Sequence, residues 1–317
     1  MNLSRLIGAL LPVFFVLALG YIAGKRNTFD ADQSAGLSKL ALTFALPASL
    51  FVSMTQIRKD LLLQQGRLVL SLILVHLGLF VAAWLLLRLA PSLRGTPSII
   101  YALMLATSAT PVFGIAVLEP LLGATSAATV GLVALTINFT VPLAVVLLEI
   151  DAAGKHKATI TSPHKPNPVI TGLNAGLKSP LLWSPILGIT VTLAGLHLPP
   201  AVASCFELIG SATSGVAVFA VGLVLAAHAV RLSPTVSLGS LARVTVQSAL
   251  LFALLHLLHV VSPFAREALV CCSFPLATVV VLFAARYKAV ESEAASMLLV
   301  STLALAITVP TILWLSH

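Results

Sequence analysis

Charged residues are scarce in this chain. Asp, Glu, Lys and Arg make up only 9% of its 317 residues, whereas hydrophobic residues make up 59%. A soluble domain carries about 25% charged residues, because charge keeps its surface wetted. So little charge excludes a soluble protein of this size, whereas a protein surrounded by lipid does not need it. The sequence therefore predicts a membrane protein whose main surroundings are the lipid bilayer.

Cysteine is also scarce, and the motifs of soluble enzymes are absent. Cys205, Cys271 and Cys272 form no CxxC or Cys/His pattern, which excludes a disulfide framework, and their apolar surroundings predict buried side chains. His256 and His259 share a helical face, but no Cys, Asp or Glu accompanies them in their span. No nucleophile elbow, zinc motif or dinucleotide fingerprint occurs. We therefore expect no catalytic residue, metal or cofactor, and we do not expect an enzyme.

Carboxylates are missing from the centres of the apolar runs. Proton- and sodium-coupled carriers often place Asp or Glu at that depth. Here we expect every acidic residue in a loop or at the wet end of a helix, namely Asp30, Asp32, Asp60, Glu119, Glu149, Asp151, Glu207, Glu267, Glu291 and Glu293. The lack of central negative charge fits an anionic solute. It leaves open whether a proton or a sodium ion is coupled to transport.

Long apolar runs are what the chain does contain. A helix that crosses a membrane needs about 20 mostly apolar residues. Runs of this kind lie at 3–24, 37–57, 66–90, 97–118, 128–149, 180–198, 206–228, 240–261, 266–286 and 293–315. The sequence therefore predicts an all-α membrane protein with about ten transmembrane helices.

Lys and Arg are divided unequally between the two sides of these spans. More of them lie in the loops that follow odd-numbered spans, and Arg231, Arg243 and Arg286 are counted there. The positive-inside rule then places the odd loops in the cytoplasm and both termini outside. The same rule explains the net charge of +8. We therefore expect no nucleic-acid partner.

A polar segment at 151–179 divides the chain. It contains Lys155 and Lys165, and we expect it to be a basic cytoplasmic linker between residues 1–150 and 180–317. Each half holds five spans, and because five is odd the second half enters the membrane in the opposite orientation. An inverted-topology repeat, a common design of secondary transporters, is therefore geometrically allowed.

The fourth and ninth spans each carry a proline near mid-span, Pro111 and Pro275. A mid-helix proline frees a backbone carbonyl that lipid cannot satisfy, and paired interruptions in two halves point to a transport site. A simple kink is the alternative. We expect the prolines to face each other across a central crossover, where amide groups and hydroxyls bind a carboxylate. The predicted substrate-binding residues are Ser108, Thr110, Pro111, Asn138, Ser273, Pro275 and Thr278.

Asn138 and the small residues of the seventh span each allow two interpretations. Asn138, midway along the fifth span, fits either this site or a hydrogen bond between helices. The seventh span is rich in small residues, with Gly210 four positions from Ser214 and Ser211 four positions from Gly215. This spacing suits either close packing of helices within the chain or a homodimer.

The order of short motifs along the whole chain resembles the auxin efflux carrier family, and the bacterial malonate carriers are the most similar members. The motifs are LPVF at 11–14, GYIAGK at 20–25, LSKL at 37–40, FALPASLF at 44–51, KSPLLWSPILG at 178–188, the stretch 219–226 and FAARY at 283–287.

The resemblance implies two inverted five-helix repeats whose broken helices four and nine cross in mid-membrane, with helices one, two, six and seven as a scaffold. It implies secondary transport of a small organic anion, malonate or a related carboxylate, across the cell's inner (plasma) membrane by alternating access. Many members have an Asn near the fourth-helix crossover, where this chain has Ala109 or Thr110, so the substrate does not follow from the resemblance. The alternatives are a passive channel and a membrane-embedded enzyme or receptor subunit. The last needs polar groups at depth or a soluble domain, and the sequence indicates neither.

Overall fold

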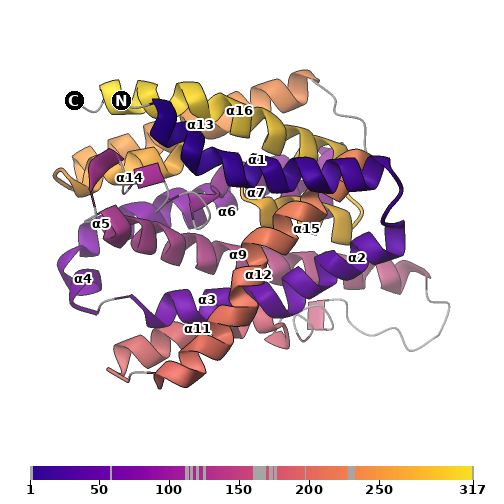
Figure 1. The fold of residues 1–317 in the computed structure, drawn as a ribbon, viewed down its shortest axis with the longest axis horizontal. Coiled ribbons are helices and arrows are strands. Elements are labelled where there is room, and N and C mark those ends of the chain that lie inside the picture. Colours follow the sequence, from indigo (N-terminus) through magenta and orange to yellow (C-terminus); the bar gives the residue numbers. More distant parts are fainter. Residues whose placement is uncertain are drawn as a thin grey trace.

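A computed structural model describes residues 3–57, 59–110, 126–159, 177–196, 198–227 and 233–315, with short pieces at 114, 117–118, 121–123, 169–170 and 174. Over these residues the chain is helical and forms no strand; the single extended pair joins Ser108 to Leu276. The protein is therefore all-α, as the sequence predicts. Most helices run side by side along the long axis of the molecule, and α12 crosses them obliquely (Figure 1).

The first helix group packs around α12. It contains α1 (Leu3–Lys25), α2 (Ala31–Leu40), the π-helical turn η1 (Ala41–Ala45), α3 (Leu46–Thr55), α11 (Pro180–Leu193) and α12 (Pro200–Ala227). Helix α12 lies against α1, α2, η1 and α3, and α11 lies against α3. This group corresponds to the first, second, sixth and seventh apolar runs of the sequence.

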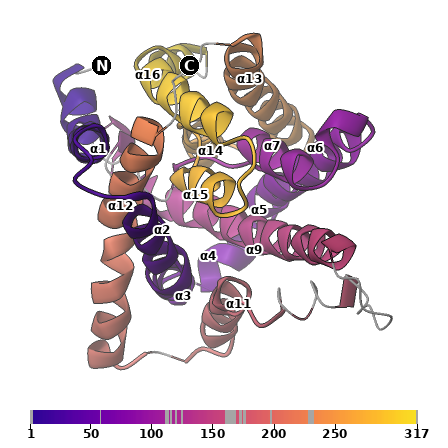
Figure 2. The same ribbon diagram turned by 90° about the vertical axis from the view of Figure 1, so that its right-hand side faces the viewer.

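The second helix group contains the remaining spans. Its members are α5 (Gly66–Ile73), η2 (Leu74–Gly78), α6 (Leu79–Leu87), α7 (Thr96–Ala106), α9 (Ser126–Thr159), α13 (Pro234–Leu257), α14 (Phe264–Cys272), α15 (Thr278–Arg286) and α16 (Glu291–Leu315). The short helices α4 (Lys59–Gln64) and η3 (Pro91–Leu93) lie in connections. In Figure 2, α7, α14 and α15 lie between α16 and α9, and all three pack against α9 or α16.

Helix starts follow from local chemistry. Asp30 and Gln33 form a reciprocal capping box at the start of α2, in which the Asp30 carboxylate accepts from the Gln33 N–H at 2.7 Å. Ser233 caps α13, and Pro234 occupies its first turn, where a missing N–H costs nothing. Prolines also begin α11 and α12. Helix α11 begins at the predicted residue 180, whereas α2, α12 and α13 begin six residues before the apolar runs predicted from 37, 206 and 240. The caps and prolines, rather than the first apolar residue, set these helix starts.

Within the described residues, five helices are long and apolar enough to cross a membrane, or six if the bent α16 is counted as one span. They are Ala31–Thr55, Gly66–Leu87, Ala128–Lys155, Pro200–Ala227 and Pro234–Leu257, with Glu291–Leu305 and Ile307–Leu313 as the bent pair. Of the other apolar runs, the fourth is helical in α7 only as far as Ala106, and the ninth is divided between α14 and α15. The broken runs fall short of a full span because their helices are interrupted.

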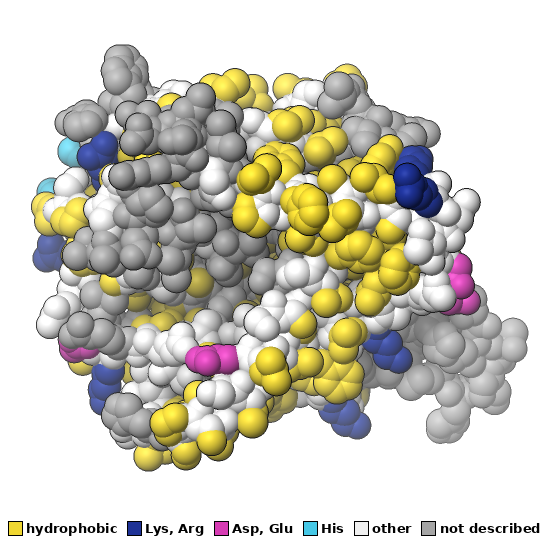
Figure 3. Space-filling view, in the orientation of Figure 1, with side chains coloured by type: hydrophobic (Ala, Val, Ile, Leu, Met, Phe, Trp, Pro, Cys, Tyr) yellow, Lys and Arg dark blue, Asp and Glu magenta, His cyan; other side chains and the backbone are white. Residues whose placement is uncertain are grey.

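The outer surface is apolar where a soluble protein would be wetted. Leu11 and Phe15 on α1 are each more than 60% exposed, and Leu208, Leu257 and Ile307 are more than 70% exposed. Figure 3 shows hydrophobic side chains gathered over α1 and α12, with Lys and Arg toward the two ends of the view. Such a large apolar surface is expected where lipid is the solvent.

Glycines bring α1 and α12 into close contact. A Cβ added to Gly222 would lie 2.4 Å from the Leu17 carbonyl oxygen, and one added to Gly20 would lie 2.2 Å from that of Phe219. Only a residue without a side chain allows two helix backbones to approach this closely. The small residues of α12 therefore serve packing within the chain, at least at Gly222. At Gly215, by contrast, no described atom lies within 4 Å of an added Cβ.

Candidate functional site

The two interrupted helices meet at their breaks. Helix α7 ends at Ala106, and Thr107 is extended; α14 ends at Cys272, and α15 begins at Thr278. The N–H of Ala109 donates to the carbonyl of Pro275 at 2.7 Å, and Ser108 pairs with Leu276 in antiparallel fashion. Backbone groups that each break frees are thereby satisfied by the other break, which is how an interrupted helix persists away from water.

Hydroxyl groups complete this crossing. The Thr110 hydroxyl donates to the Cys271 carbonyl at 3.0 Å and lies 2.6 Å from the Ser108 hydroxyl. In the break between α14 and α15, the Leu276 N–H donates to the Ser301 hydroxyl of α16 at 3.1 Å. The Ser273 hydroxyl donates to Val270 within α14 at 2.6 Å. A buried cluster of hydroxyl and backbone groups therefore surrounds the breaks.

The residues predicted from the sequence divide into three sets. Ser108, Thr110, Ser273 and Pro275 are buried at the crossing, and Thr278 is half-buried at the first position of α15. Pro111 lies outside the described residues. Asn138 lies on α9, and its amide donates to the Ser53 hydroxyl of α3 at 3.3 Å. This bond connects the two helix groups and corresponds to the interhelical interpretation of Asn138.

Arg243 is a polar residue at this site, and the prediction that it is a loop charge is wrong. It lies within α13 and is completely buried. Its Nε and Nη2 donate to the Thr107 carbonyl at 3.1 and 3.0 Å. One turn further along α13, Gln247 is also buried, and its amide donates to the Ala106 carbonyl at 3.3 Å. The two side chains therefore cap the C-terminal end of α7, where orphan carbonyls and a negative dipole end attract donors and positive charge.

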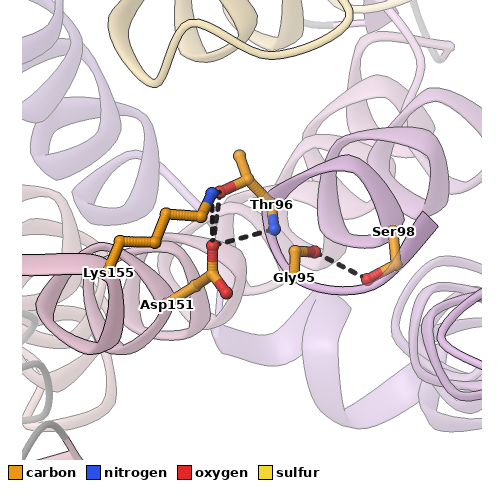
Figure 4. Close-up of polar contacts among 5 residues, drawn as sticks. All are labelled: Gly95, Thr96, Ser98, Asp151 and Lys155. Carbon is orange, nitrogen blue, oxygen red and sulfur yellow. Dashed lines mark hydrogen bonds and ion pairs between the residues drawn. The ribbon is translucent and has the colours of Figure 1, made fainter. Parts of the chain in front are cut away.

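The other end of α7 is fixed by α9 (Figure 4). Asp151 accepts hydrogen bonds from the Thr96 N–H at 2.9 Å and the Thr96 hydroxyl at 2.5 Å, and Lys155 lies 2.9 Å from the same carboxylate. Gly95, at φ +81°, brings its backbone so close that an added Cβ would lie 2.5 Å from the carboxylate. The segment expected to be a linker from residue 151 is thus helical to Thr159, and its first residue is a cap for α7.

Glu267 differs from the wet helix end expected of it. Its side chain is 1% exposed in the first turn of α14, and one carboxylate oxygen accepts a hydrogen bond from the Thr129 hydroxyl of α9. The second oxygen, Oε1, has no hydrogen-bond partner among the described residues. A buried carboxylate therefore lies within the second helix group, close to the break in sequence. Burial of a charge is costly in a membrane and is a mark of function.

His76 is a second buried titratable group. It lies in η2, where Nδ1 contacts the Leu72 carbonyl at 2.9 Å and the Thr136 hydroxyl at 3.1 Å. Nε2 has no partner among the described residues, and η2 packs against α13. By contrast, His256 and His259 are exposed, as is Cys205, which the sequence predicted to be buried.

Arg286 and Tyr287, at the C-terminal end of α15, both contact Glu149 of α9. Arg286 pairs with Glu149 at 3.1 Å, and the Tyr287 hydroxyl donates to the same carboxylate at 2.7 Å. Burial holds the pKa of Tyr287 well above its usual range, so its proton remains available to Glu149. Together with the Asp151 cap, this contact connects both broken helices to α9.

The family model for membrane transport proteins, which covers the auxin efflux carriers, matches residues 5–313. The chain belongs to this family. It is 29% identical over 316 residues to the uncharacterized transporter YfdV of Escherichia coli K12, which covers 99% of this chain and 98% of that protein. The YfdV protein of Shigella flexneri matches to the same extent.

A shorter match concerns an animal protein. A stretch of 54 residues, 17% of this chain, is 44% identical to 6% of the lysosomal cholesterol signaling protein of the mouse. The family match and the YfdV matches identify the chain as a multi-pass membrane transporter, and they confirm the resemblance to the auxin efflux carriers.

Proposed function

We propose that this chain is a secondary active transporter that moves a small organic anion, malonate or a related carboxylate, by alternating access. The observation that supports it is the bond between Ala109 and Pro275, which joins two interrupted helices from opposite halves of the chain. Interrupted helices at membrane depth occur where their ends bind a solute or one another.

The solute contacts surround this crossing. Thr278 begins α15, whose first amide groups and positive dipole end favour an anion. The hydroxyls of Ser108, Thr110 and Ser273 and the backbone at Pro275 lie at the same crossing and supply further hydrogen-bonding groups. Pro111 is kept in the proposed site from the sequence alone. Asn138 contributes at the boundary between the two helix groups, where its present partner is Ser53.

Alternating access is proposed as a movement of the second helix group against the first. Helix α7 is fixed to its own group at both ends, by Asp151 and by Arg243. It therefore moves with α9 and α13 rather than separately. In this proposal residues 1–150 and 180–317 are inverted repeats that cross the inner membrane. The 151–179 segment and the other odd loops face the cytoplasm, and both termini lie on the outer side. Two copies associate as a homodimer.

Glu267 is the proposed site for a coupling proton or sodium ion. The carboxylate is buried, and Oε1 has no donor among the residues that the structure describes. A carboxylate of this kind either binds a proton or coordinates a hard cation together with the Thr129 hydroxyl. Uptake of an anion together with a cation also lowers the charge that crosses the membrane.

Proteoliposomes that contain the purified protein provide the test. Labelled malonate, malate and lactate are supplied outside, and saturable uptake of at least one, accelerated by the same unlabelled anion inside, is expected. No saturable uptake or exchange of any carboxylate would contradict the proposal. Ion flux far above carrier rates would favour a channel instead.

A further inference from the structure

We infer that Arg243 binds a carboxylate group of the transported anion through the outer edge of its guanidinium group, and that Gln247 assists it. This inference rests on the proposed transport of a carboxylate and adds the residue that recognises the carboxylate itself.

Arg243 has N–H groups that no described residue occupies. A guanidinium carries five N–H donors in a planar fork. Nε and Nη2 both donate to one acceptor, the Thr107 carbonyl. Nη1 is buried and has no partner among the described residues. Both hydrogens of Nη1 and the second hydrogen of Nη2 therefore remain. One hydrogen on each of these nitrogens lies along the outer edge of the guanidinium group, and the pair suits the two oxygens of one carboxylate.

The positive charge of Arg243 has no negative partner in the described part of the chain. Arg243 is completely buried, and no ion pair within the described part of the chain includes it. A backbone carbonyl offsets only part of the cost of burying a guanidinium group, which is why buried charges are normally paired. An anionic ligand at the same place would supply the missing negative charge.

Arg243 and Gln247 lie at the break that follows α7. Arg243 and Gln247 are four residues apart on α13, so they share one face of the helix, and both donate to the last carbonyls of α7. Gln247 Oε1 is also buried without a partner. Two polar side chains with unused groups thus lie at the break that is proposed to bind the solute. The Oε1 atom accepts from a hydroxyl or a protonated carboxyl group, so Gln247 suits a ligand with a second polar group beside its carboxylate.

The experiment compares Arg243→Gln and Arg243→Lys with Arg88→Gln, a matched change of an exposed arginine at the end of α6. Labelled malonate uptake and the thermal stabilisation of detergent-purified protein by malonate are measured, with uncharged malonamide as the comparison ligand. We expect the KM for malonate to rise by about tenfold or more in Arg243→Gln, because the charge-assisted pair is lost. Arg88→Gln is expected to remain within about twofold, as is usual for exposed charges. Malonamide should stabilise none of the proteins.

The possible results separate a failure of the role of Arg243 from a failure of the proposed transport function. A folded Arg243→Gln protein with an unchanged KM would overturn the role of Arg243 and leave the proposed function intact. If that variant does not fold, Arg243→Lys decides, because it keeps the positive charge at the end of α7 but loses the fork; an unchanged KM in it would also overturn the inference. If the wild type transports no carboxylate, the proposed function fails. Stabilisation by malonate in the wild type but in neither variant would then still support Arg243 as an anion site.

Discussion

The backbone N–H of Ala109 donates to the carbonyl of Pro275 across 2.7 Å, although one residue follows α7 and the other follows α14 in the opposite half of the chain. Ser108 and Leu276 extend the contact as an antiparallel pair. The two breaks are thus held together by backbone groups, and substitutions of side chains around them should change solute binding more than the crossing itself.

Thr110 and Thr278 provide the first prediction. Thr110→Val removes the hydrogen bond to the Cys271 carbonyl, and Thr278→Val removes a hydroxyl from the start of α15. Both should weaken malonate transport. Thr110→Val should also lower the free energy of unfolding by about 1–3 kcal/mol, since a buried carbonyl loses its donor. Ser92→Ala, in the exposed turn before α7, is the control for uptake rate and melting temperature. Equal effects of all three changes would contradict the assignment.

Gly222 gives a prediction about packing. An alanine Cβ at this position would lie 2.4 Å from the Leu17 carbonyl oxygen, so α1 and α12 would have to separate. We expect Gly222→Ala to lower stability by about 1–3 kcal/mol, the usual cost of overpacking. Gly215→Ala on the same helix adds the same atom where no described atom lies within 4 Å, and it should not lower stability, because alanine favours a helix more than glycine does. Melting curves of the two purified variants in one detergent make the comparison. Indistinguishable curves would count against the close α1–α12 contact.

The all-α fold and the location of the helix breaks could be predicted because each depends on local sequence. The apolar runs give the helices, and the proline of the ninth run marks an interruption wherever it lies. Of the predicted site residues, Ser108 and Thr110 are brought together with Ser273 and Pro275. Asn138 instead bonds to Ser53, since a single amide in an apolar run indicates depth but not which neighbour faces it.

Arg243 and Glu267 could not be placed in the same way. Both lie near the ends of apolar runs, where a charge normally reaches water, and nothing in their local sequence distinguishes a buried end from a wet one. Their burial depends on how α13 and α14 pack against α7 and α9, which is a tertiary property. A signal was nevertheless available for Arg243: Gln247 lies four residues further, and two large polar side chains on one face of an apolar helix indicate a polar partner.

Glu267 provides the prediction about ion coupling. Glu267→Gln keeps the shape of the side chain and the contact with Thr129 but removes the charge. If this carboxylate carries the coupling ion, wild-type uptake of malonate rises with an inward proton or sodium gradient and uptake by the variant does not. Exchange of malonate for malonate, which needs no net movement of the ion, should persist in the variant. Glu207→Gln, at an exposed position on α12, is the control. Full stimulation of Glu267→Gln by either gradient would exclude this role.

In the proposed mechanism, the two helix groups move against each other to carry an anion past the helix breaks. The contact between Asn138 on α9 and Ser53 on α3, 3.3 Å between amide nitrogen and hydroxyl oxygen, allows a direct test. Cysteines replace both residues in a protein whose exposed Cys205 is Ala, and a short, reducible bifunctional thiol reagent connects them. Labelled malonate uptake is then measured in proteoliposomes before cross-linking, after it and after reduction. We expect uptake to be lost on cross-linking and to return on reduction, whereas undiminished uptake by fully cross-linked protein would show that the two helix groups do not need to move.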